Sequence, residues 1–369
     1  MAEIRKRIAI QQRVLPTYRI PFFDALAAEC ERGLSVFAGK PRRSESLDVG
    51  ARPISAKFAL GKNIHLFDGM AYLCWQVGIM NWLRAWQPDV LIMEANPRYL
   101  RSGAALNWMK ARGGKVIGWG LGSPRPPGIF SEMRMSFRKR FVSRFDALVT
   151  YSQLGAEEYT TLGFPPDLIF SAPNAVAPKP VLPLPERPSS FRNDKPNVVF
   201  VGRLQTRKRV DILLKACSML PVEQRPALVI VGDGPERRRL EALAKEVYPD
   251  ARFTGAQHGS DLEKIYRKAD LFVLPGTGGL AVQQAMSFGL PVIVGESDGT
   301  QSNLVRDENG WTLTETSAEG LSRLMRNALG SIPKLRSMGA ASYRIVSQEV
   351  NLENMVDAFA SAIRKVTEG

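Results

Sequence analysis

The chain has 369 residues, too many for one ordinary domain and suited to two, and its apolar fraction of 44% allows a sizeable core. No window approaches 18 uninterrupted apolar residues, which excludes a membrane-spanning helix. The net charge is +14, and +11 of it lies in residues 1–180, which hold 25 basic and 14 acidic residues. This excess predicts an anionic partner for the first half, or else a basic surface that is only solvated.

The first half alternates short apolar runs with longer amphipathic segments. Strands are predicted at 7–14, 34–37, 63–67, 90–93, 115–119, 147–150 and 168–171. Helices are predicted at about 21–32, 73–86, 98–112, 131–143 and 153–162. This alternation predicts a doubly wound α/β domain with a parallel sheet over residues 1–172.

Residues 173–196 contain seven prolines and no periodicity, which predicts an extended linker. A second α/β series is predicted over residues 197–351. Its strands are expected at 198–201, 227–231, 251–253, 271–274, 291–294 and 311–313, and its helices at about 210–219, 236–247, 260–268, 280–288, 318–328 and 332–349. A last amphipathic helix is expected at 352–365, and residues 352–369 can pack back on the first domain. In such sheets ligands bind at the carboxyl ends of the strands, and here the two sets of ends can face each other across a cleft.

The three cysteines, Cys30, Cys74 and Cys217, are widely spaced and match no metal or disulfide pattern. The N-terminus has neither the apolar core nor the small-residue cleavage site of a signal peptide. A reducing cytoplasm is therefore the simplest expected setting.

Two cations follow the first strand of the second half. Arg203 comes directly after the strand, and Lys208 comes five residues later, before an apolar helix. An arginine fork and a lysine point charge at one strand end can converge on one anion. The alternative is a solvated basic loop, since Arg207 and Arg209 are basic too.

Three further strand ends carry turn residues. Residues 229–235 read VIVGDGP, where Gly232 allows close approach of the backbone, although a purely structural turn is the alternative. Residues 253–255 read FTG at the end of the next strand. Residues 271–296 read as strand, the glycine turn PGTGG, helix and strand, which suits a phosphate at the helix start or a βα turn without a ligand.

The order of these pieces resembles the C-terminal domain of GT-B glycosyltransferases of family 4, the large retaining nucleotide-sugar group. The resemblance is close over Val198–Gly310 and includes the ending QAMSFGLPVI of the last stretch. For the whole chain it implies the GT-B architecture, in which two doubly wound Rossmann-like domains face each other across a cleft.

The same resemblance implies a donor site. Arg203 and Lys208 would bind the donor diphosphate, the glycine turn would meet the diphosphate and the sugar, and residues 253–255 would hold the base. The implied donor-binding set is Arg203, Lys208, Gly232, Phe253, Thr254, Gly255, Gly276, Thr277, Gly278, Gly279 and Gln284.

The glycine turn departs from the family pattern, which usually has two glutamates eight positions apart. Gly276 and Gln284 stand at those positions. The amide of Gln284 can still hydrogen-bond a ribose hydroxyl, whereas Gly276 cannot replace a carboxylate. Retaining transfer must stabilise an oxocarbenium-like centre, so either another group takes that role or the chain is not a typical catalyst. The candidate catalytic residues are Glu94, Glu296 and Thr277.

The first domain is expected to hold the acceptor in loops at its strand ends. Tyr18 and Arg19 are predicted to be exposed between two prolines, and Asn96 and Arg98 follow the fourth strand. Glu94 ends that buried strand, with a helix N-cap or a loop carboxylate as the alternative. For Arg19 and Arg98 the alternative is an ordinary surface arginine.

Residues 124–145 interleave basic residues with aromatic and aliphatic ones. A basic amphipathic helix of this kind can lie on an anionic membrane surface. The alternative is a helix whose apolar face packs on its own sheet.

The predicted function is a glycosyltransferase of hexosyltransferase type. It would move a sugar, with retention, from a nucleotide-diphosphate donor to a saccharide or lipid-linked acceptor, as in cell-envelope polysaccharide or glycolipid assembly. It would be cytoplasmic, with a peripheral position at the inner face of the membrane as an open extension. No metal and no cofactor are predicted, because Arg203 and Lys208 supply the cations and no DxD pair ends a strand.

Three alternatives remain open. The missing carboxylates favour a non-catalytic nucleotide-sugar-binding or scaffold subunit with the same fold. A sugar-nucleotide epimerase would need acids and a histidine at the cleft, which the sequence does not offer. A nucleic-acid-binding protein is suggested only by charge, and no nucleic-acid partner is predicted.

Overall fold

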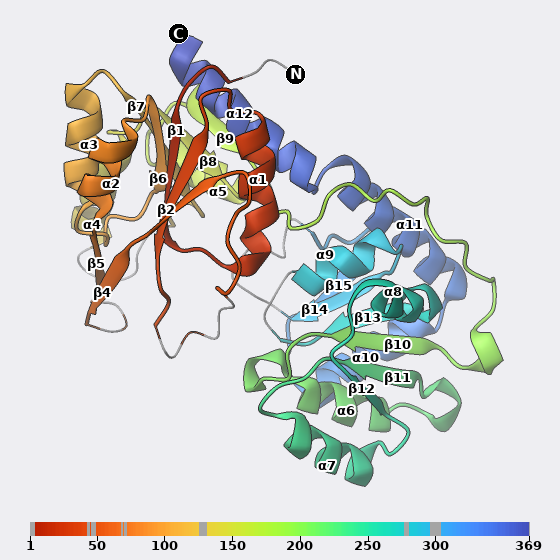
Figure 1. The fold of residues 1–369 in the computed structure, drawn as a ribbon. Helices are drawn as coiled ribbons and strands as arrows, with labels where there is room; N and C mark the ends of the chain where they lie inside the picture. The colour runs from red at the N-terminus through yellow and green to blue at the C-terminus, as the bar shows by residue number, and fades with distance from the viewer. Residues whose placement is uncertain are drawn as a thin grey trace. The chain divides into compact units, whose positions relative to one another are not determined.

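The computed structural model describes residues 4–42, 45, 49–67, 69, 72–124, 131–276, 280–295 and 304–368 (Figure 1). The chain divides into two compact units. Unit 1 comprises Met1–Val176 and Leu352–Gly369, and unit 2 comprises Ala177–Asn351. Each unit is a Rossmann-like α/β domain, as predicted.

Unit 1 contains a seven-stranded parallel sheet in the order β3-β2-β1-β6-β7-β8-β9. The strands are β1 (Ile8–Val14), β2 (Leu34–Gly39), β3 (Lys57–Leu60), β6 (Val90–Glu94), β7 (Lys115–Gly120), β8 (Ala147–Thr150) and β9 (Ile169–Ser171). The short edge strand β3 is absent from the prediction, because its four residues are all partly or fully exposed and carry no buried run.

Helices cover both faces of this sheet. They are α1 (Ile20–Ala28), α2 (Ile79–Trp86), α3 (Ser102–Ala111), α4 (Ser131–Val142), α5 (Gln153–Thr161) and α12 (Leu352–Glu368). On one face the C-terminal helix α12 packs beside α1, and the ring of Phe359 lies 4.8 Å from that of Phe22 and 4.7 Å from that of Trp119. On the other face α2 and α3 bury Leu83 and Leu106 in a continuous core.

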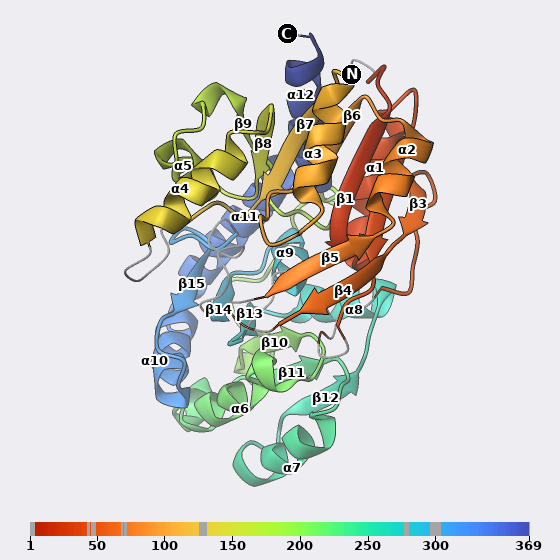
Figure 2. The same cartoon turned by 90° about the vertical axis from the view of Figure 1, so that its left-hand side faces the viewer.

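The prediction of a helix at 73–86 is wrong for residues 73–77. Residues Leu73–Val77 form β5, which pairs antiparallel with β4 (Lys62–Leu66), and α2 begins only after Gly78 (Figure 2). Burial alternates along β5, with Cys74 and Gln76 inward, which is the period of a strand. Gly78 adopts φ +95°, a conformation that ends the strand and that favours glycine. The strand predicted at 63–67 therefore belongs to this hairpin and not to the parallel sheet.

Unit 2 contains a six-stranded parallel sheet in the order β12-β11-β10-β13-β14-β15. The strands are β10 (Asn197–Val201), β11 (Ala227–Val231), β12 (Arg252–Gly255), β13 (Leu271–Leu274), β14 (Val292–Gly295) and β15 (Gly310–Leu313). The helices are α6 (Val210–Ser218), α7 (Arg237–Val247), α8 (Gly259–Lys268), α9 (Leu280–Ser287), α10 (Ala318–Leu329) and α11 (Ile332–Gln348). The elements expected from the sequence here all occur, with ends within about three residues of those predicted.

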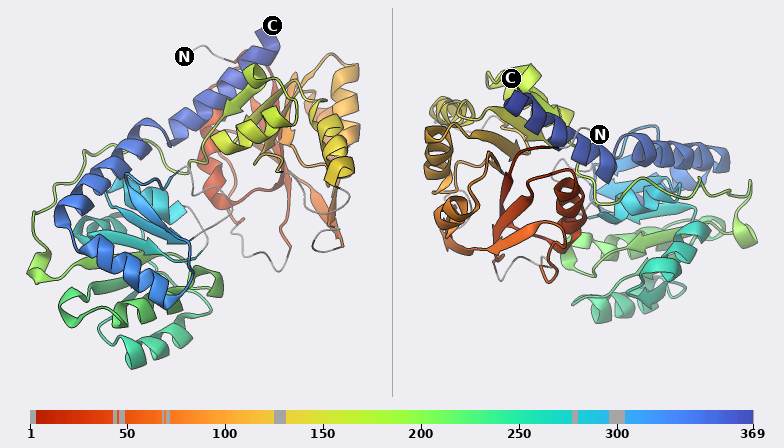
Figure 3. Two further views of the ribbon diagram at one scale, coloured as in Figure 1. Left: turned by 180° about the vertical axis from the view of Figure 1, so that it is seen from behind. Right: turned by 45° about the horizontal axis from the view of Figure 1, so that its top comes forward.

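The proline-rich segment 177–196 is extended and is held along unit 2 (Figure 3, left). The guanidinium of Arg187 donates to the carbonyl oxygens of Phe288 at 2.8 Å and Tyr266 at 3.2 Å. The hydroxyl of Tyr343 donates to the carbonyl oxygen of Leu182 at 2.8 Å. The segment is thus part of unit 2 and not a free tether.

Candidate functional site

The strand order of unit 2 reverses between β10 and β13. From β10 the chain runs outward to β11 and β12, then returns to β13 and runs outward the other way. In open parallel sheets, the crevice at the carboxyl ends beside such a reversal is the usual place for a ligand. The loops after β10 and β13, which carry Arg203, Lys208 and Gly276, flank this point.

The two predicted cations differ in environment. Arg203 is exposed, whereas Lys208 is half-buried at the end of a single 3-10 turn, Thr206–Lys208. Burial, reinforced by the positive charge of Arg207, lowers the pKa of Lys208 to about 8. An ammonium group stripped of water in this way gains much from a bound anion, because the anion replaces the lost hydration.

Glycines allow the loops at this edge to touch. A Cβ atom on Gly276 would lie 2.0 Å from the carbonyl oxygen of Arg207, and one on Gly232 would lie 1.9 Å from that of Gly202. Gly232 also has φ +136°, which favours glycine. The backbone N–H of Leu204 donates to the carbonyl oxygen of Asp233 at 2.9 Å. These contacts fix the loop that carries Arg203 against the turns after β11 and β13.

The predicted base-binding segment lies at the same edge. The N–H of Gly232 donates to the carbonyl oxygen of Gly255 at 2.8 Å, which joins the end of β12 to the turn after β11. Phe253 and Thr254 are partly buried, and the side chain of Gln257 donates to the carbonyl oxygen of Thr254 at 3.0 Å. The structure therefore gathers Arg203, Lys208, Gly232, Phe253, Thr254, Gly255 and Gly276 at the carboxyl edge of one sheet.

The rest of the predicted donor set is only partly described. Thr277, Gly278, Gly279 and Glu296 lie outside the described residues. Gln284 is exposed on α9, so its amide is accessible. Its neighbour Gln283 is buried and donates to the carbonyl oxygen of Val350 at 2.8 Å, which is a structural role.

The sheet of unit 1 reverses in the same way between β1 and β6. A cavity of about 1530 Å³ opens at this carboxyl edge. Its lining includes Glu94, Asn96 and Arg98, which the sequence singled out. Two aromatic residues also line the cavity. Trp119 lies near the end of β7, and Tyr151 directly follows β8.

The prediction that Arg19 is exposed is wrong. Its side chain is only 6% exposed, because the 3-10 turn Thr17–Arg19 leads directly into α1 and turns the guanidinium inward. The guanidinium carbon lies 5.2 Å from the ring centroid of Trp119 and 5.4 Å from that of Tyr151, a cation–π arrangement. Tyr18, also predicted to be exposed, is half-buried, and its ring lies 5.6 Å from the same guanidinium.

Two buried nitrogen donors beside this cavity have no partner among the described residues, Nη1 of Arg19 and Nε1 of Trp119. Buried donors are normally paired, so each can still donate a hydrogen bond to an oxygen atom of a ligand. The sequence analysis singles out neither Trp119, which lies within β7, nor Tyr151 as a site residue. The position of Tyr151 directly after a strand was the signal that could have found it.

Glu94 ends β6 and lines the cavity. One of its carboxylate oxygens accepts the backbone N–H of Arg13 at 2.9 Å, and Tyr99 also hydrogen-bonds to it. Burial raises the pKa of Glu94, and the bonds from Tyr99 and Arg13 oppose that shift only in part. A carboxyl group of this kind can change its charge at a higher pH than an exposed glutamate.

Helix α4 forms part of the cavity wall. It buries Phe141 and Val142 in the core, while Met133 and Phe137 are 65% and 61% exposed and line the cavity. Its basic residues Lys139 and Arg140 are exposed. Residues 125–130 of the predicted membrane-binding segment lie outside the described residues. Across the described part of the chain, no helix has the length and apolar character needed to cross a membrane.

Comparisons with known proteins relate unit 2 to a family. Residues 185–345, all within unit 2, match the family model described as Glycosyl transferases group 1. The chain is 36% identical over 129 residues to the sulfoquinovosyl transferase SQD2 of Arabidopsis thaliana. That match covers 34% of this chain and 24% of the relative. It is 39% identical over 122 residues to a GDP-mannose-dependent alpha-mannosyltransferase of Mycobacterium tuberculosis, covering 32% of this chain and 30% of the relative.

The whole chain also resembles solved structures. The Anabaena protein Alr3699/HepE, solved in complex with UDP, superposes with a TM-score of 0.69 at 14% identity, over 98% of this chain and 100% of that one. At this identity the likeness establishes the fold alone, which is GT-B. The chain spans about a quarter to a third of the length of the two curated relatives named above. Residues 185–345 of unit 2 thus match glycosyl transferases group 1, and the chain has the GT-B fold.

Proposed function

We propose that the protein is a glycosyltransferase that moves a sugar from a nucleotide-diphosphate donor to a saccharide or lipid-linked acceptor. The observation that carries the proposal is the pairing of exposed Arg203 with half-buried Lys208 at the strand reversal of the group 1 domain. Both named relatives transfer a glycosyl group, and the solved Anabaena protein holds UDP.

In this proposal the carboxyl edge of unit 2 is the donor site. Arg203 offers two donors to one phosphate group, and Lys208 supplies a second positive charge from a partly dry position. The turns at Gly232 and Gly276 meet the diphosphate, and residues 253–255 hold the base. Gln284 hydrogen-bonds the ribose, and Thr277, Gly278 and Gly279 bind the diphosphate and the sugar. No metal or cofactor is required, because the two side chains balance the charge of the departing diphosphate.

The cavity of unit 1 is the proposed acceptor site. Asn96 and Arg98 hydrogen-bond acceptor hydroxyls at its rim, and Tyr18 and Arg19 act from beneath its aromatic floor. Glu94, as a carboxylate, accepts a hydrogen bond from the attacking hydroxyl and positions it. Exposed Met133 and Phe137 give the cavity an apolar wall, which suits a lipid-linked acceptor better than a free sugar.

We infer that transfer proceeds with retention, as in family 4, although the usual pair of glutamates is replaced. The close packing of Gly276 on the backbone of Arg207 supports a turn built differently and not one that has merely lost a side chain. Thr277 and Glu296 are the candidates in the sequence for the role of the missing glutamates. The proposed setting is cell-envelope polysaccharide or glycolipid assembly on the cytoplasmic face of a membrane.

The test combines nucleotide binding with transfer. Nucleotide sugars are first screened for thermal stabilisation, since a bound donor raises stability by mass action. The stabilising donor is then incubated with saccharide and lipid-linked acceptors, and the product anomer is read by NMR. Transfer with retention is the expected result.

A non-catalytic binding or scaffold subunit is the second candidate, favoured by the absence of a carboxylate at Gly276 and Gln284. It would bind UDP or GDP in the screen and transfer no sugar to any acceptor. Absence of both binding and transfer would contradict both functions.

A further inference from the structure

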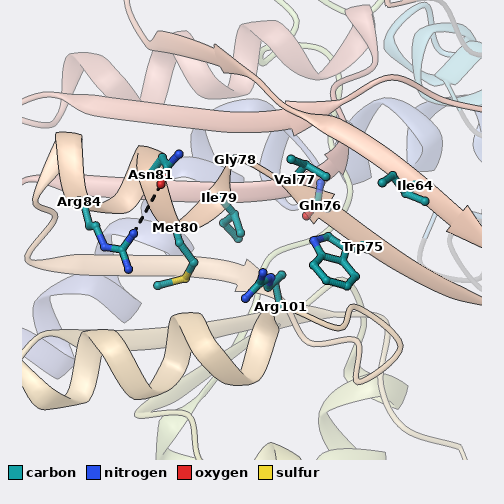
Figure 4. A pocket seen from close by; sticks show the side chains of 10 residues that line it. All are labelled: Ile64, Trp75, Gln76, Val77, Gly78, Ile79, Met80, Asn81, Arg84 and Arg101. Atoms are coloured by element: carbon teal, nitrogen blue, oxygen red, sulfur yellow. Dashed lines mark hydrogen bonds between the residues drawn. The ribbon is translucent and has the colours of Figure 1, made fainter.

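The hairpin of β4 and β5 presents an apolar surface to solvent. Ile64, Trp75 and Val77 are 40%, 39% and 42% exposed, and they line a pocket of about 480 Å³ together with Met80 of α2 (Figure 4). Ile64 pairs directly with Trp75 across the two strands, so these side chains form one continuous patch.

Core packing does not require these residues to be apolar. The inward residues of β5 are Cys74 and Gln76, and the Gln76 amide donates to the carbonyl oxygen of Gln12 at 3.0 Å and to the side chain of Asn63 at 3.0 Å. In a half-exposed antiparallel pair the solvent face is normally polar. Here the pattern is inverted, with polar groups inward and a tryptophan outward, which marks an interaction surface.

Among the described residues that line the pocket, both charged side chains are basic. Arg101 lies over Trp75, with its guanidinium carbon 4.7 Å from a ring centroid, and Arg84 reaches the pocket from α2 with a hydrogen bond of 3.5 Å to Asn81 (Figure 4). Neither arginine forms an ion pair with another described residue. Lys62 stands opposite Val77 on the neighbouring strand, and the described residues that line the pocket include no acid.

The patch continues into the wall of the larger cavity. The N–H of Cys74 donates to the carbonyl oxygen of Arg98 at 3.0 Å, and that of Leu100 donates to the carbonyl oxygen of Cys74 at 3.0 Å. This pairing sets Arg101 beside Trp75. Leu73 and Leu100 line the larger cavity, so adjacent residues of the same two segments line both hollows.

We propose that this face docks on an anionic phospholipid bilayer, with a lipid phosphate held by Arg84 and Arg101 and the acyl chains against Ile64, Trp75 and Val77. Tryptophan and arginine side by side suit the boundary between headgroups and acyl chains. The negative surface of such a bilayer complements the two unpaired guanidiniums. The further consequence, that a lipid-linked acceptor enters the neighbouring cavity from this bilayer, rests on the proposed function.

The experiment measures binding of the full chain to vesicles. Phosphatidylglycerol mixed with phosphatidylcholine is compared with phosphatidylcholine alone by co-flotation. The chain is expected to bind the anionic vesicles at least tenfold more tightly. The double variant Arg84→Gln/Arg101→Gln is expected to lose about 30-fold of that affinity, since each basic residue near an anionic surface accounts for about fivefold.

Arg112 provides the matched control. Its guanidinium carbon lies 4.4 Å from the ring centroid of Trp108 on α3, so it forms the same kind of pair away from the pocket. Arg112→Gln should change vesicle affinity less than twofold, whereas Arg101→Gln alone should lower it about fivefold. Equal losses in the two variants would overturn the site, because they would mean that only net charge matters.

The depth to which Trp75 enters the bilayer is tested separately, with vesicles whose acyl chains carry bromine. Tryptophan fluorescence should be quenched on binding, and Trp75→Phe should remove most of that quenching. Quenching that persists in Trp75→Phe and vanishes in Met133→Ser/Phe137→Ser would transfer the membrane contact to α4 and overturn the proposal. If soluble glycerol phosphate displaced the protein from the vesicles, the proposal would also be overturned. The ligand would then be a free phosphate.

Thermal stabilisation by UDP and GDP is measured on every variant in parallel. It reports on the donor loops of unit 2 and requires no bilayer, and it shows that each variant is folded. Failure of vesicle binding with intact nucleotide binding therefore contradicts the docking surface, and the reverse result contradicts the donor site.

Discussion

Arg203 and Lys208 are the residues on which the proposed donor site depends most directly. Replacing either by alanine removes a charge-assisted hydrogen bond to the diphosphate, which is worth about 1.5–3 kcal/mol. We therefore expect Arg203→Ala and Lys208→Ala each to weaken UDP or GDP binding by that amount in isothermal titration calorimetry. Lys215→Ala, on the exposed side of α6, serves as the control. Unchanged affinity in both site variants would exclude this edge of the sheet.

The lowered pKa of Lys208 predicts a pH dependence of binding. Burial moves this pKa down from 10.5 to about 8, so the free protein loses the Lys208 proton as the pH rises through about 8. A diphosphate prefers the charged form, so nucleotide affinity should fall as the pH rises above about 8, and binding near that pH should take up a proton.

Titrations in buffers of different ionisation enthalpy measure this proton uptake. Lys208→Arg keeps the charge at all these pH values, because an arginine stays protonated, and should show a flat profile. A flat profile in the unmodified chain would mean that Lys208 does not contact the nucleotide.

The close packing of the backbone requires a glycine at position 276, because a larger side chain would clash there. A Cβ atom there would lie 2.0 Å from the carbonyl oxygen of Arg207 and 2.7 Å from the carbonyl carbon of Lys208, and backbone atoms cannot move aside cheaply. We expect Gly276→Ala to lower the free energy of unfolding by about 1–3 kcal/mol in urea denaturation.

Gly103 in α3 is the control for that variant, because the one atom that a Cβ would meet there is the end of the Arg144 side chain at 3.6 Å. Gly103→Ala should be neutral or slightly stabilising. Gly276→Glu should not raise turnover, although it restores the usual family residue. A gain in turnover would show that the turn can accept the carboxylate after all.

At the scale of elements, the linker segment behaves as a strap on unit 2. Arg187 belongs to this segment and is half-buried, and this burial lowers the pKa of its guanidinium to about 10. Its donors satisfy carbonyl oxygens at the ends of α8 and α9, including that of Phe288. Removing them leaves buried acceptors unpaired, each worth about 1–3 kcal/mol.

Arg187→Ala is therefore expected to lower the free energy of unfolding by about 2–4 kcal/mol in urea denaturation. Arg192→Ala, an exposed residue of the same segment, should change it by less than about 0.5 kcal/mol. Equal effects would mean that the strap carries no stability of its own.

At the scale of the whole molecule, the proposed donor contacts lie in unit 2 and the proposed acceptor cavity lies in unit 1. A nucleotide alone should stabilise the protein by about 2.7 kcal/mol at 100 times its dissociation constant. The protection from hydrogen exchange should concentrate in the loops at 202–208, 232–236 and 253–257 of unit 2. Protection at Glu94 and Trp119 without protection in these loops would reverse the assignment of the two sites.

Most of the fold was determined by local patterns in the chain. The buried runs of unit 2 are short, regular and separated by amphipathic helices, so the prediction located each of these strands and helices within about three residues. The prediction of a helix at residues 73–77 was wrong because these residues form a strand, β5, with Cys74 and Gln76 inward and Trp75 and Val77 outward. Read as a sequence of apolar residues, that pattern resembles the start of a helix.

The sequence by itself determined where the strands, turns and basic residues lie along the chain, because each of these depends on neighbouring residues. The tertiary structure alone decided the burial of Arg19 against Trp119 and Tyr151 and the contact of Gly276 with Arg207. Each of these joins segments far apart in the chain, and no local periodicity records which strands lie side by side. The charge and spacing of a residue are written in the sequence, but its depth and its partners arise only when the sheet forms.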